Sequence, residues 1–254
     1  MSIDAEEAIE RLVEDLKEIS KKGFVRSERS HDTGIGKTLE EHLGVTENNL
    51  KAPDYMNLIE VKAKRNMSIS MFTMFTKSPS YPRGANGIIL DKYGYPDEQF
   101  PSLKELHTTI SATDFNTVRN GFGFKAEVSR PERRVYVKIK DLKTGKIFDD
   151  VIYYTFEDLE KAFKKCKSIA AVGADHKEID GKEHFHFTDV TIWYLIGIEN
   201  LINAIERGYV LIDIRLGVFR SGEKYGKLHD HGTGFRINSS DIGKLFRTRE
   251  LKLS

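Results

Sequence analysis

The chain has 254 residues, of which 39% are hydrophobic and 31% charged, and its 15 Phe and 10 Tyr are enough for a sizeable core, which excludes wholesale disorder. A single cysteine, Cys166, excludes an intramolecular disulfide and a cysteine-cluster metal site. No apolar run reaches the roughly 18 residues of a membrane span, and the acidic N-terminus lacks the apolar stretch of a secretory signal. We therefore expect a cytoplasmic protein of one large domain or two small lobes.

Positive charge is concentrated in two stretches, although the net charge of the whole chain is only +1. Five cations and no acid lie between Val61 and Leu90, and from Arg215 to Ser254 nine basic residues face four acidic ones. Local positive surface on a neutral protein can form a phosphate-binding groove, because the field near a groove depends mainly on nearby charges. Ordinary solvated lysines on exposed faces are the alternative interpretation.

Hydrophobic periodicity predicts the elements of the first half of the chain. Apolar residues recur close to every 3.6 positions over Ile3–Lys22, which predicts a helix that ends at Gly23. In chain order there follow a glycine-punctuated loop over 30–36, a short helix over 37–43, a β-branched strand over 58–63 and a short buried strand over 86–90.

Strands dominate the prediction from about Glu105 to Tyr154. Alternating apolar and polar residues predict strands over 122–128, 134–140 and 146–154, with a hairpin turn at 143–145. The pattern then predicts a helix over 156–167, a strand over 168–172, a turn over 178–182, a helix over 197–207, a strand over 209–216, a glycine-rich hairpin or loop over 217–237, a short helix over 240–245 capped by Ser239 or Ser240, and a final strand. The mixture predicts an α+β fold.

The sharpest local feature is the run from Pro53 to Lys62, PDYMNLIEVK. The period of a strand places Glu60 and Lys62 on one face, about 6.5 Å apart along the chain, and Asp54 lies at the strand entrance. Two carboxylates and a backbone carbonyl suit Mg²⁺, which prefers oxygen ligands, and the neighbouring lysine could hold or deprotonate an attacking water. The run predicts metal-dependent phosphodiester hydrolysis. A charged surface strand is the alternative, because the acid-x-Lys pattern recurs elsewhere in the chain.

Two segments in the right order resemble a known family. The run over 34–49, GIGKTLEEHLGVTENN, followed by the Asp54…Glu60-x-Lys62 strand, resembles the catalytic core of the MvaI/BcnI family of restriction endonucleases. These enzymes are related to the mismatch-repair nicking enzyme MutH within the PD-(D/E)xK nuclease superfamily. The runs DIRLGVFR (213–220) and HDHGTGFRI (229–237) are similar to that family's DNA-reading segment. The middle of the chain, over 68–151, has no residue-by-residue match.

The resemblance implies a role for several residues at the catalytic end. Asp54 and Glu60 would bind Mg²⁺, and Lys62 would be the catalytic lysine. Glu40 matches an additional acid that the MutH-like branch places beside the metal, and an exposed helix carboxylate is the alternative for it; neighbouring Glu41 is expected to be solvated.

The C-terminal segments make physical sense as readers of bases, because arginine can donate two hydrogen bonds to guanine and a carboxylate can accept one from cytosine. A structural ion pair is the alternative for Asp213 and Arg215, and phosphate contact or solvation is expected for Arg220. His231 is similar to a histidine that contacts the central base pair in family members. The candidate DNA-binding residues are Asp213, Arg215, Arg220, His229, His231 and Arg236.

The resemblance also implies a fold and a division of the chain. We expect an α+β, PD-(D/E)xK core, with a mixed sheet flanked by helices and two lobes around a DNA cleft. Within the single endonuclease chain 1–254, the catalytic lobe would comprise approximately 1–100 and part of 156–195, and the DNA-recognition lobe approximately 101–155 and 196–254.

The function implied is that of a type II restriction endonuclease with Mg²⁺ as cofactor. It would cut double-stranded DNA at a short CCNGG-type sequence, leave 5′-phosphates, and act as a monomer by sequential nicking, with no nucleotide cofactor and no membrane. A MutH-like mismatch-repair nicking endonuclease and a catalytically silent DNA-binding module are the alternatives.

Two rival sites carry less support. The histidine pairs 184/186 and 229/231 would bind zinc if they converged, and nothing in the sequence indicates that they do. The run Gly34-Ile-Gly-Lys-Thr38 superficially resembles a phosphate-binding loop, but His31 stands where that motif needs its first glycine.

Overall fold

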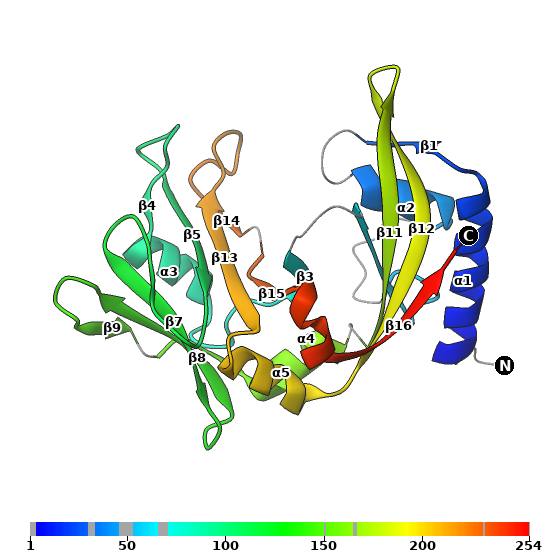
Figure 1. The fold of residues 1–254 in the computed structure, drawn as a ribbon. Coiled ribbons are helices and arrows are strands. Elements are labelled where there is room, and N and C mark those ends of the chain that lie inside the picture. Colours follow the sequence, from blue (N-terminus) through cyan, green and yellow to red (C-terminus); the bar gives the residue numbers. More distant parts are fainter. Residues whose placement is uncertain are drawn as a thin grey trace. The chain divides into compact units, whose positions relative to one another are not determined.

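The computed structural model of the protein describes residues 4–29, 34–45, 53–65, 71–149, 151–164, 167–230 and 232–253. The chain folds into two compact units, each built from discontinuous segments. Unit 1 comprises Met1–Ile69, Lys164–Ile196 and Phe246–Ser254, and unit 2 comprises Ser70–Phe163 and Gly197–Leu245. Residues 70–100 therefore belong to the unit that contains 101–155, and the last nine residues belong to the unit that contains the N-terminus. The predicted α+β class is confirmed (Figure 1).

In its described residues, unit 1 contains a mixed five-stranded sheet and two helices. Its elements are α1 (Ala5–Lys21), β1 (Val25–Arg26), α2 (Gly34–His42), β2 (Glu60–Arg65), β11 (Ser168–Ile179), β12 (Lys182–Leu195) and β16 (Phe246–Lys252). The strand order is β1-β12-β11-β2, and β16 also pairs with β12. Strand β2 runs parallel to β11, whereas the other pairs are antiparallel. None of the helices that the structure describes is long and apolar enough to cross a membrane.

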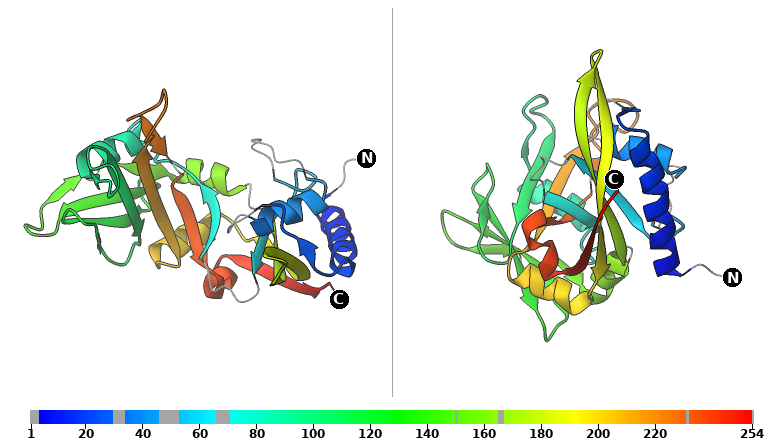
Figure 2. Two further views of the ribbon diagram at one scale, coloured as in Figure 1. Left: turned by 90° about the horizontal axis from the view of Figure 1, so that it is seen from above. Right: turned by 45° about the vertical axis from the view of Figure 1, so that its right-hand side comes forward.

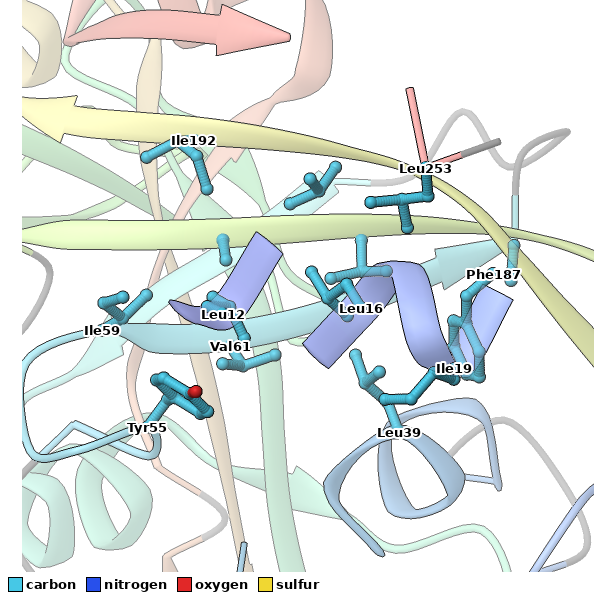
Figure 3. Packing of buried hydrophobic residues seen from close by; sticks show 14 of the residues in the cluster. Leu12, Leu16, Ile19, Leu39, Tyr55, Ile59, Val61, Phe187, Ile192 and Leu253 are labelled. Carbon is cyan, nitrogen blue, oxygen red and sulfur yellow. The ribbon is translucent and has the colours of Figure 1, made fainter. Parts of the chain in front are cut away.

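The core of unit 1 lies between α1, α2 and one face of this sheet. Helix α1 begins at the N-cap Asp4, whose carboxylate accepts hydrogen bonds from the first-turn amides. Its apolar stripe, which includes Leu12 and Leu16, packs with Leu39 of α2 and Val61 of β2 (Figure 3). Helix α1 also contacts β12 and lies along the β11–β12 hairpin in both views (Figures 1 and 2). Burial of this stripe explains why the predicted helix forms here.

Strand β2 carries apolar residues on one face and charged residues on the other. Val61 is 5% exposed and joins the core together with Ala63. Because side chains alternate along a strand, Glu60 and Lys62 lie on the face away from α1. Their partners in the register with β11 are Ile169 and Ala171, which are both buried. The strand predicted over 58–63 is thus present, shifted two residues toward the C-terminus.

Unit 2 contains two further sheets, all of whose strand pairs are antiparallel. The first has the order β3-β15-β13-β5-β4, with β14 on β13, and the second has the order β10-β8-β7-β6, with β9 on β8. The elements are β3 (Met71–Thr76), α3 (Ala85–Tyr93), β4 (Tyr95–Pro96), β5 (Lys104–Ile110), β6 (Asn116–Thr117), β7 (Phe122–Ser129), β8 (Arg134–Asp141), β9 (Ile147–Asp149), β10 (Tyr153–Thr155), α4 (Phe156–Phe163), α5 (Ile198–Glu206), β13 (Val210–Val218), β14 (Leu228–Asp230), β15 (Gly234–Asn238) and the 3-10 helix η2 (Ser239–Lys244).

The strand predicted over 86–90 is wrong, because this segment belongs to helix α3. The buried residues of α3 are Ala85, Asn86, Ile89, Leu90 and Tyr93, which recur with the period of a helix. The apolar window 86–90 is too short to reveal that period, since the two end members of the buried stripe lie outside it.

Several other predicted boundaries also differ from the structure. Helix α2 begins at Gly34 rather than at residue 37, and the strand predicted over 168–172 continues to Ile179 as one arm of the long β11–β12 hairpin. The predicted strand over 146–154 is divided into β9 and β10, and α4 ends at Phe163. The last short helix is 3-10, and its N-cap is Asn238 rather than Ser239 or Ser240. The turns at 143–145 and 178–182 are confirmed.

Candidate active site and nucleic-acid interface

A tight turn precedes β2 and reverses the chain at the candidate active site. Tyr55 and Ile59 form an antiparallel bridge, with the Tyr55 amide donating to the Ile59 carbonyl at 2.9 Å and the Ile59 amide donating back at 3.1 Å. Between them, Met56 has φ 51° and Asn57 has φ 58°. Two successive positive φ angles are typical of a type I′ turn, and asparagine tolerates this region better than methionine does.

The turn brings Asp54 alongside the first residues of β2. One carboxylate oxygen of Asp54, Oδ2, accepts a hydrogen bond from the amide of Val61 at 3.1 Å. Strand β2 lies at the edge of the described sheet, and this contact gives one of its main-chain amides a hydrogen-bond acceptor. The other carboxylate oxygen is not part of this contact. Asp54 is therefore fixed next to Glu60, which precedes Val61 in the chain.

Glu60 and Lys62 are in direct contact, which confirms the prediction that they share one face of the strand. Lys62 Nζ donates to Glu60 Oε1 at 2.6 Å, and the side chains are 37% and 19% exposed, respectively. The turn thus holds the Asp54 carboxylate at the amide of Val61, which lies between Glu60 and Lys62 in the strand, and these two share a direct contact.

Tyr55 anchors the turn to helix α1. Its ring is 5% exposed within the core of unit 1, and its hydroxyl donates to Asp15 Oδ2 at 2.5 Å. Burial and the hydrogen bond to Asp15 both raise the pKa of Tyr55, so the phenol stays protonated. Sequence reasoning missed Asp15, because an acid in the middle of an amphipathic helix looks merely solvated, and no local pattern links it to a tyrosine 40 residues later.

We expect Tyr55→Phe to lower the free energy of unfolding by about 1 kcal/mol, because the substitution removes the hydroxyl but keeps the buried ring. This loss is small for a hydrogen bond to a charged group, because the Asp15 carboxylate is exposed and water can take the place of the hydroxyl. Urea unfolding followed by circular dichroism measures the effect. The matched control is Tyr225→Phe, at a side chain that is 54% exposed; equal losses in the two variants would show that the Asp15 contact stabilises nothing.

Glu40 lies on α2, which packs against β2. Its side chain is half-buried, whereas that of Glu41 is exposed, as expected. The core contacts of α2 come from Ile35 and Leu39. A role for Glu40 beside a metal stays a prediction.

The donor set around Asp54 fits a hard divalent cation. Its members are two carboxylates close to a main-chain segment, and Mg²⁺ is commonly bound by one or two carboxylates together with water. Across the described ranges, no group of three or more His, Cys, Asp or Glu side chains converges, and zinc usually requires three or four such ligands.

The described histidines of the zinc hypothesis make other contacts. A ring nitrogen of His184 lies 2.9 Å from the Lys182 carbonyl, and one of His186 lies 3.1 Å from the Ser20 carbonyl, both in unit 1. His229, in unit 2, stacks on Phe219 with ring centroids 4.3 Å apart. His231 lies outside the described residues, so its predicted base contact stays a prediction.

In unit 2, Asp213 is the centre of a buried charged cluster. Asp213 is 5% exposed. Its Oδ1 accepts from Thr109 Oγ1 at 2.9 Å, and its Oδ2 accepts from Arg236 Nη1 at 3.0 Å. Arg215 Nε lies 3.2 Å from the same Oδ2. Both carboxylate oxygens are therefore engaged within the protein, as in the ion-pair alternative of the sequence analysis.

The two arginines remain more accessible than the carboxylate between them. The side chains of Arg215 and Arg236 are 44% and 28% exposed, against 8% for Asp213. The Nε atom of Arg236 is buried without a hydrogen-bond partner. Thr109 belongs to the middle segment that matched no motif, and only the pairing of β5 with β13 reveals it.

Arg220 is held by an acidic neighbour. Its Nε donates to Asp97 Oδ2 at 2.8 Å, and its Nη2 lies 3.8 Å from Glu105 Oε2. Desolvation opposes the ionisation of Asp97, but hydrogen bonds from the Gln99 amide and from Arg220 outweigh it, so the pKa of Asp97 is lowered. The sequence predicts phosphate contact or solvation for Arg220; the structure pairs it with Asp97, and its contact with phosphate stays a prediction.

The run over 34–38, which superficially resembles a phosphate-binding loop, forms the first turn of helix α2 instead. Thr38 Oγ1 donates to the Gly34 carbonyl at 2.8 Å and accepts from the Glu28 amide at 3.0 Å. A Cβ atom on Gly34 would lie 2.3 Å from the Arg29 carbonyl oxygen, so close packing explains this glycine.

Comparisons with known proteins identify the family. The model of the MvaI/BcnI restriction endonuclease family matches residues 13–246. A solved complex of restriction endonuclease MvaI with its cognate DNA substrate is 32% identical, with full coverage of both chains and a TM-score of 0.87. MvaI in the absence of DNA is 31% identical over 98% of this chain and 99% of its own, with a TM-score of 0.64. The comparison with curated proteins found no match. The chain therefore belongs to the MvaI/BcnI family and is a type II restriction endonuclease.

Proposed function

We propose that this protein is a Mg²⁺-dependent endonuclease that hydrolyses phosphodiester bonds of duplex DNA at a short CCNGG-type sequence. The observation that carries the proposal is the turn that holds the Asp54 carboxylate against β2, beside the ion-paired Glu60 and Lys62. Duplex DNA as the substrate is supported by the likeness to MvaI, which was solved with its cognate DNA.

Asp54 and Glu60 would hold the metal ion, together with a main-chain carbonyl of β2. When bound, a divalent cation stabilises negative charge on the scissile phosphate and lowers the pKa of a bound water. Asp54 is suited to this role because its second oxygen is left over from the Val61 contact. Glu60 is suited because its side chain is only 19% exposed and is held by Lys62, so binding a metal costs it little side-chain freedom.

Lys62 would orient the attacking water through the ammonium group that now donates to Glu60. A water oxygen attacks phosphorus, a new O–P bond forms, and the bond from phosphorus to the 3′-oxygen breaks. The proton released by the water passes to solvent, and the leaving 3′-oxygen takes one up. The products are a 5′-phosphate and a 3′-hydroxyl.

Arg215 and Arg236 are the residues best placed to read guanine, because each has donors beyond those that contact Asp213. Asp213 would then orient the two guanidinium groups rather than accept from cytosine. A pair of arginines on one carboxylate suits a site with two adjacent G·C pairs. We propose that one chain reads the whole site as a monomer and cuts the two strands in successive nicks.

Digestion of a plasmid of known sequence with the purified protein tests this function. We expect cuts at CCNGG-type sites with Mg²⁺, 5′-phosphate ends on mapping, and no cutting with EDTA. A nicked intermediate should accumulate before the linear product if the strands are cut in turn. Nicking of one strand only when a partner protein is added would favour the repair nickase, and DNA binding without any cutting would favour the silent module.

A further inference from the structure

One face of the β10-β8-β7-β6 sheet is apolar and buried, whereas the other carries cations and aromatic rings. Along β8, Val135, Val137 and Ile139 are each 0% exposed. The alternate residues of β8 and their neighbours on β7 and β10 face the other way. This second side, the basic sheet face, comprises Lys125, Glu127, Arg134, Tyr136, Lys138, Lys140 and Tyr153.

Like charges oppose each other on this face. Lys125 of β7 is the direct register partner of Lys138 of β8, and like charges in this position destabilise an antiparallel pair. Lys138 Nζ lies 3.4 Å from Glu127 Oε1, but the Glu127 side chain is 55% exposed, so solvent weakens that pair. Lys125 and Lys140 share one ring, that of Phe115, at 5.9 and 4.0 Å from its centroid. The fold thus gathers lysines at some cost to its own stability.

Arg134 extends the charge along β8. Its guanidinium carbon lies 4.1 Å from the ring centroid of Tyr153, and its Nη1 donates to the Tyr136 hydroxyl at 3.0 Å. A guanidinium held flat in this way keeps other donors for a phosphate oxygen. The rings of Tyr136 and Tyr153, which contact this guanidinium, pack on one another with centroids 5.6 Å apart.

We propose that the basic sheet face binds the sugar–phosphate backbone of duplex DNA outside the target sequence. The inference rests on the proposed function, and it adds a second DNA contact to the one that reads the site. The face carries four cations. Two acids offset part of this charge: Glu127, which pairs with Lys138, and Glu132, which accepts a hydrogen bond from the Tyr136 hydroxyl. The positive charge that remains complements a polyanion. Contacts of this kind carry no sequence information, because phosphates are the same at every step.

Duplex DNA fits this face better than a single strand does. Binding of single strands relies on exposed rings on which bases stack. Here the Tyr136 ring is covered by Lys138 Nζ at 5.0 Å, and the Tyr153 ring lies between Arg134 and Tyr81, whose ring is stacked on it with centroids 5.3 Å apart. The Tyr136 and Tyr153 rings therefore support the cations, and the exposed ring in this group is that of Tyr81, which is 50% exposed.

The test is the binding of a duplex that lacks the target sequence, measured by fluorescence anisotropy in EDTA over a range of salt concentrations. We expect the triple variant K125Q/K138Q/K140Q to lower the slope of log K against log salt by about 2–3, and to weaken binding roughly tenfold or more at low salt. The matched control K17Q/K92Q/K161Q removes the same charge from exposed lysines elsewhere and should keep the wild-type slope.

Four further measurements separate a loss of charge from a loss of structure. Restoring charge with K125R/K138R/K140R should restore the slope, and the single variant K140Q should lower it by about 1. On a short duplex that ends near the target, the triple variant should cleave at the wild-type rate. The wild-type protein should bind a duplex with longer flanks more tightly than the short one, and the triple variant should lose this gain in affinity.

An unchanged slope in an otherwise active triple variant would overturn this inference and leave the proposed function standing. A preference of the face for single strands, seen as a larger loss for a single-stranded probe than for the duplex, would overturn it as well. A wild-type protein that neither binds nor cuts duplex DNA would overturn both proposals.

Discussion

Lys62→Ala is expected to reduce the rate of DNA cleavage by about 10²–10⁴-fold, the usual contribution of a group that positions or moves a proton in the reaction. The loss should fall on the chemical step, because Lys62 contacts Glu60 rather than the Asp213 cluster of unit 2 that we propose reads the DNA. Single-turnover cleavage with saturating enzyme measures that step. Equilibrium binding of the target duplex in EDTA should change by less than about threefold, since one cation contributes only one phosphate contact.

Lys64→Ala is the matched control for this experiment. Lys64 lies two residues further along β2, on the same face, and is exposed. It should therefore report on any general effect of removing a lysine from this strand, with a cleavage rate close to that of the wild type. Equal rates for the two variants, or a Lys62→Ala variant that retains more than a tenth of the wild-type rate, would contradict the role of Lys62.

Asp213→Asn is expected to impair both stability and specificity. The substitution keeps the shape of the side chain but leaves Arg215 and Arg236 without their shared carboxylate. Removing one partner from a fully buried ion pair costs about 3–5 kcal/mol, and we expect about 2 kcal/mol here because both arginines are partly exposed. Urea unfolding gives this value, with Glu223→Gln, at an exposed loop residue, as the control.

The effect of Asp213→Asn on specificity follows from its two arginine partners. If the carboxylate orients them toward guanine, kcat/KM at the target should fall about 10–100-fold, corresponding to about 1–3 kcal/mol of lost discrimination. At sites with one altered base pair, kcat/KM should fall less than it does at the target. The ratio of kcat/KM at the target to kcat/KM at such a site should therefore decrease. A variant that loses stability but keeps the full preference would show that the cluster is only structural.

Local patterns predicted the parts of the protein that local physics determines. The helix at the N-terminus and the strand with Glu60 and Lys62 both follow from side-chain periodicity, and the structure confirms them. The position of Asp54 depends on a turn whose two central residues, Met56 and Asn57, have positive φ. Neither residue is glycine, so the standard signal for such a turn is absent.

Contacts between distant segments account for what the sequence did not predict. Asp15 reaches the turn before β2 only because α1 packs in the same core as β2, and Thr109 reaches Asp213 only because β5 pairs with β13. The prediction for the segment over 86–90 is wrong for a related reason. An apolar run of five residues fits either a strand or a helix, and its burial within unit 2 as part of α3 decides between the two.

Anomalous diffraction from crystals of the protein containing Mn²⁺ in place of Mg²⁺ would locate the metal directly. We predict one peak in contact with the carboxylates of both Asp54 and Glu60, and loss of that peak in Asp54→Asn, which can still accept from the Val61 amide through its side-chain carbonyl. A peak bound by other side chains, or one that persists unchanged in Asp54→Asn, would contradict the assignment of this turn and strand as the catalytic centre.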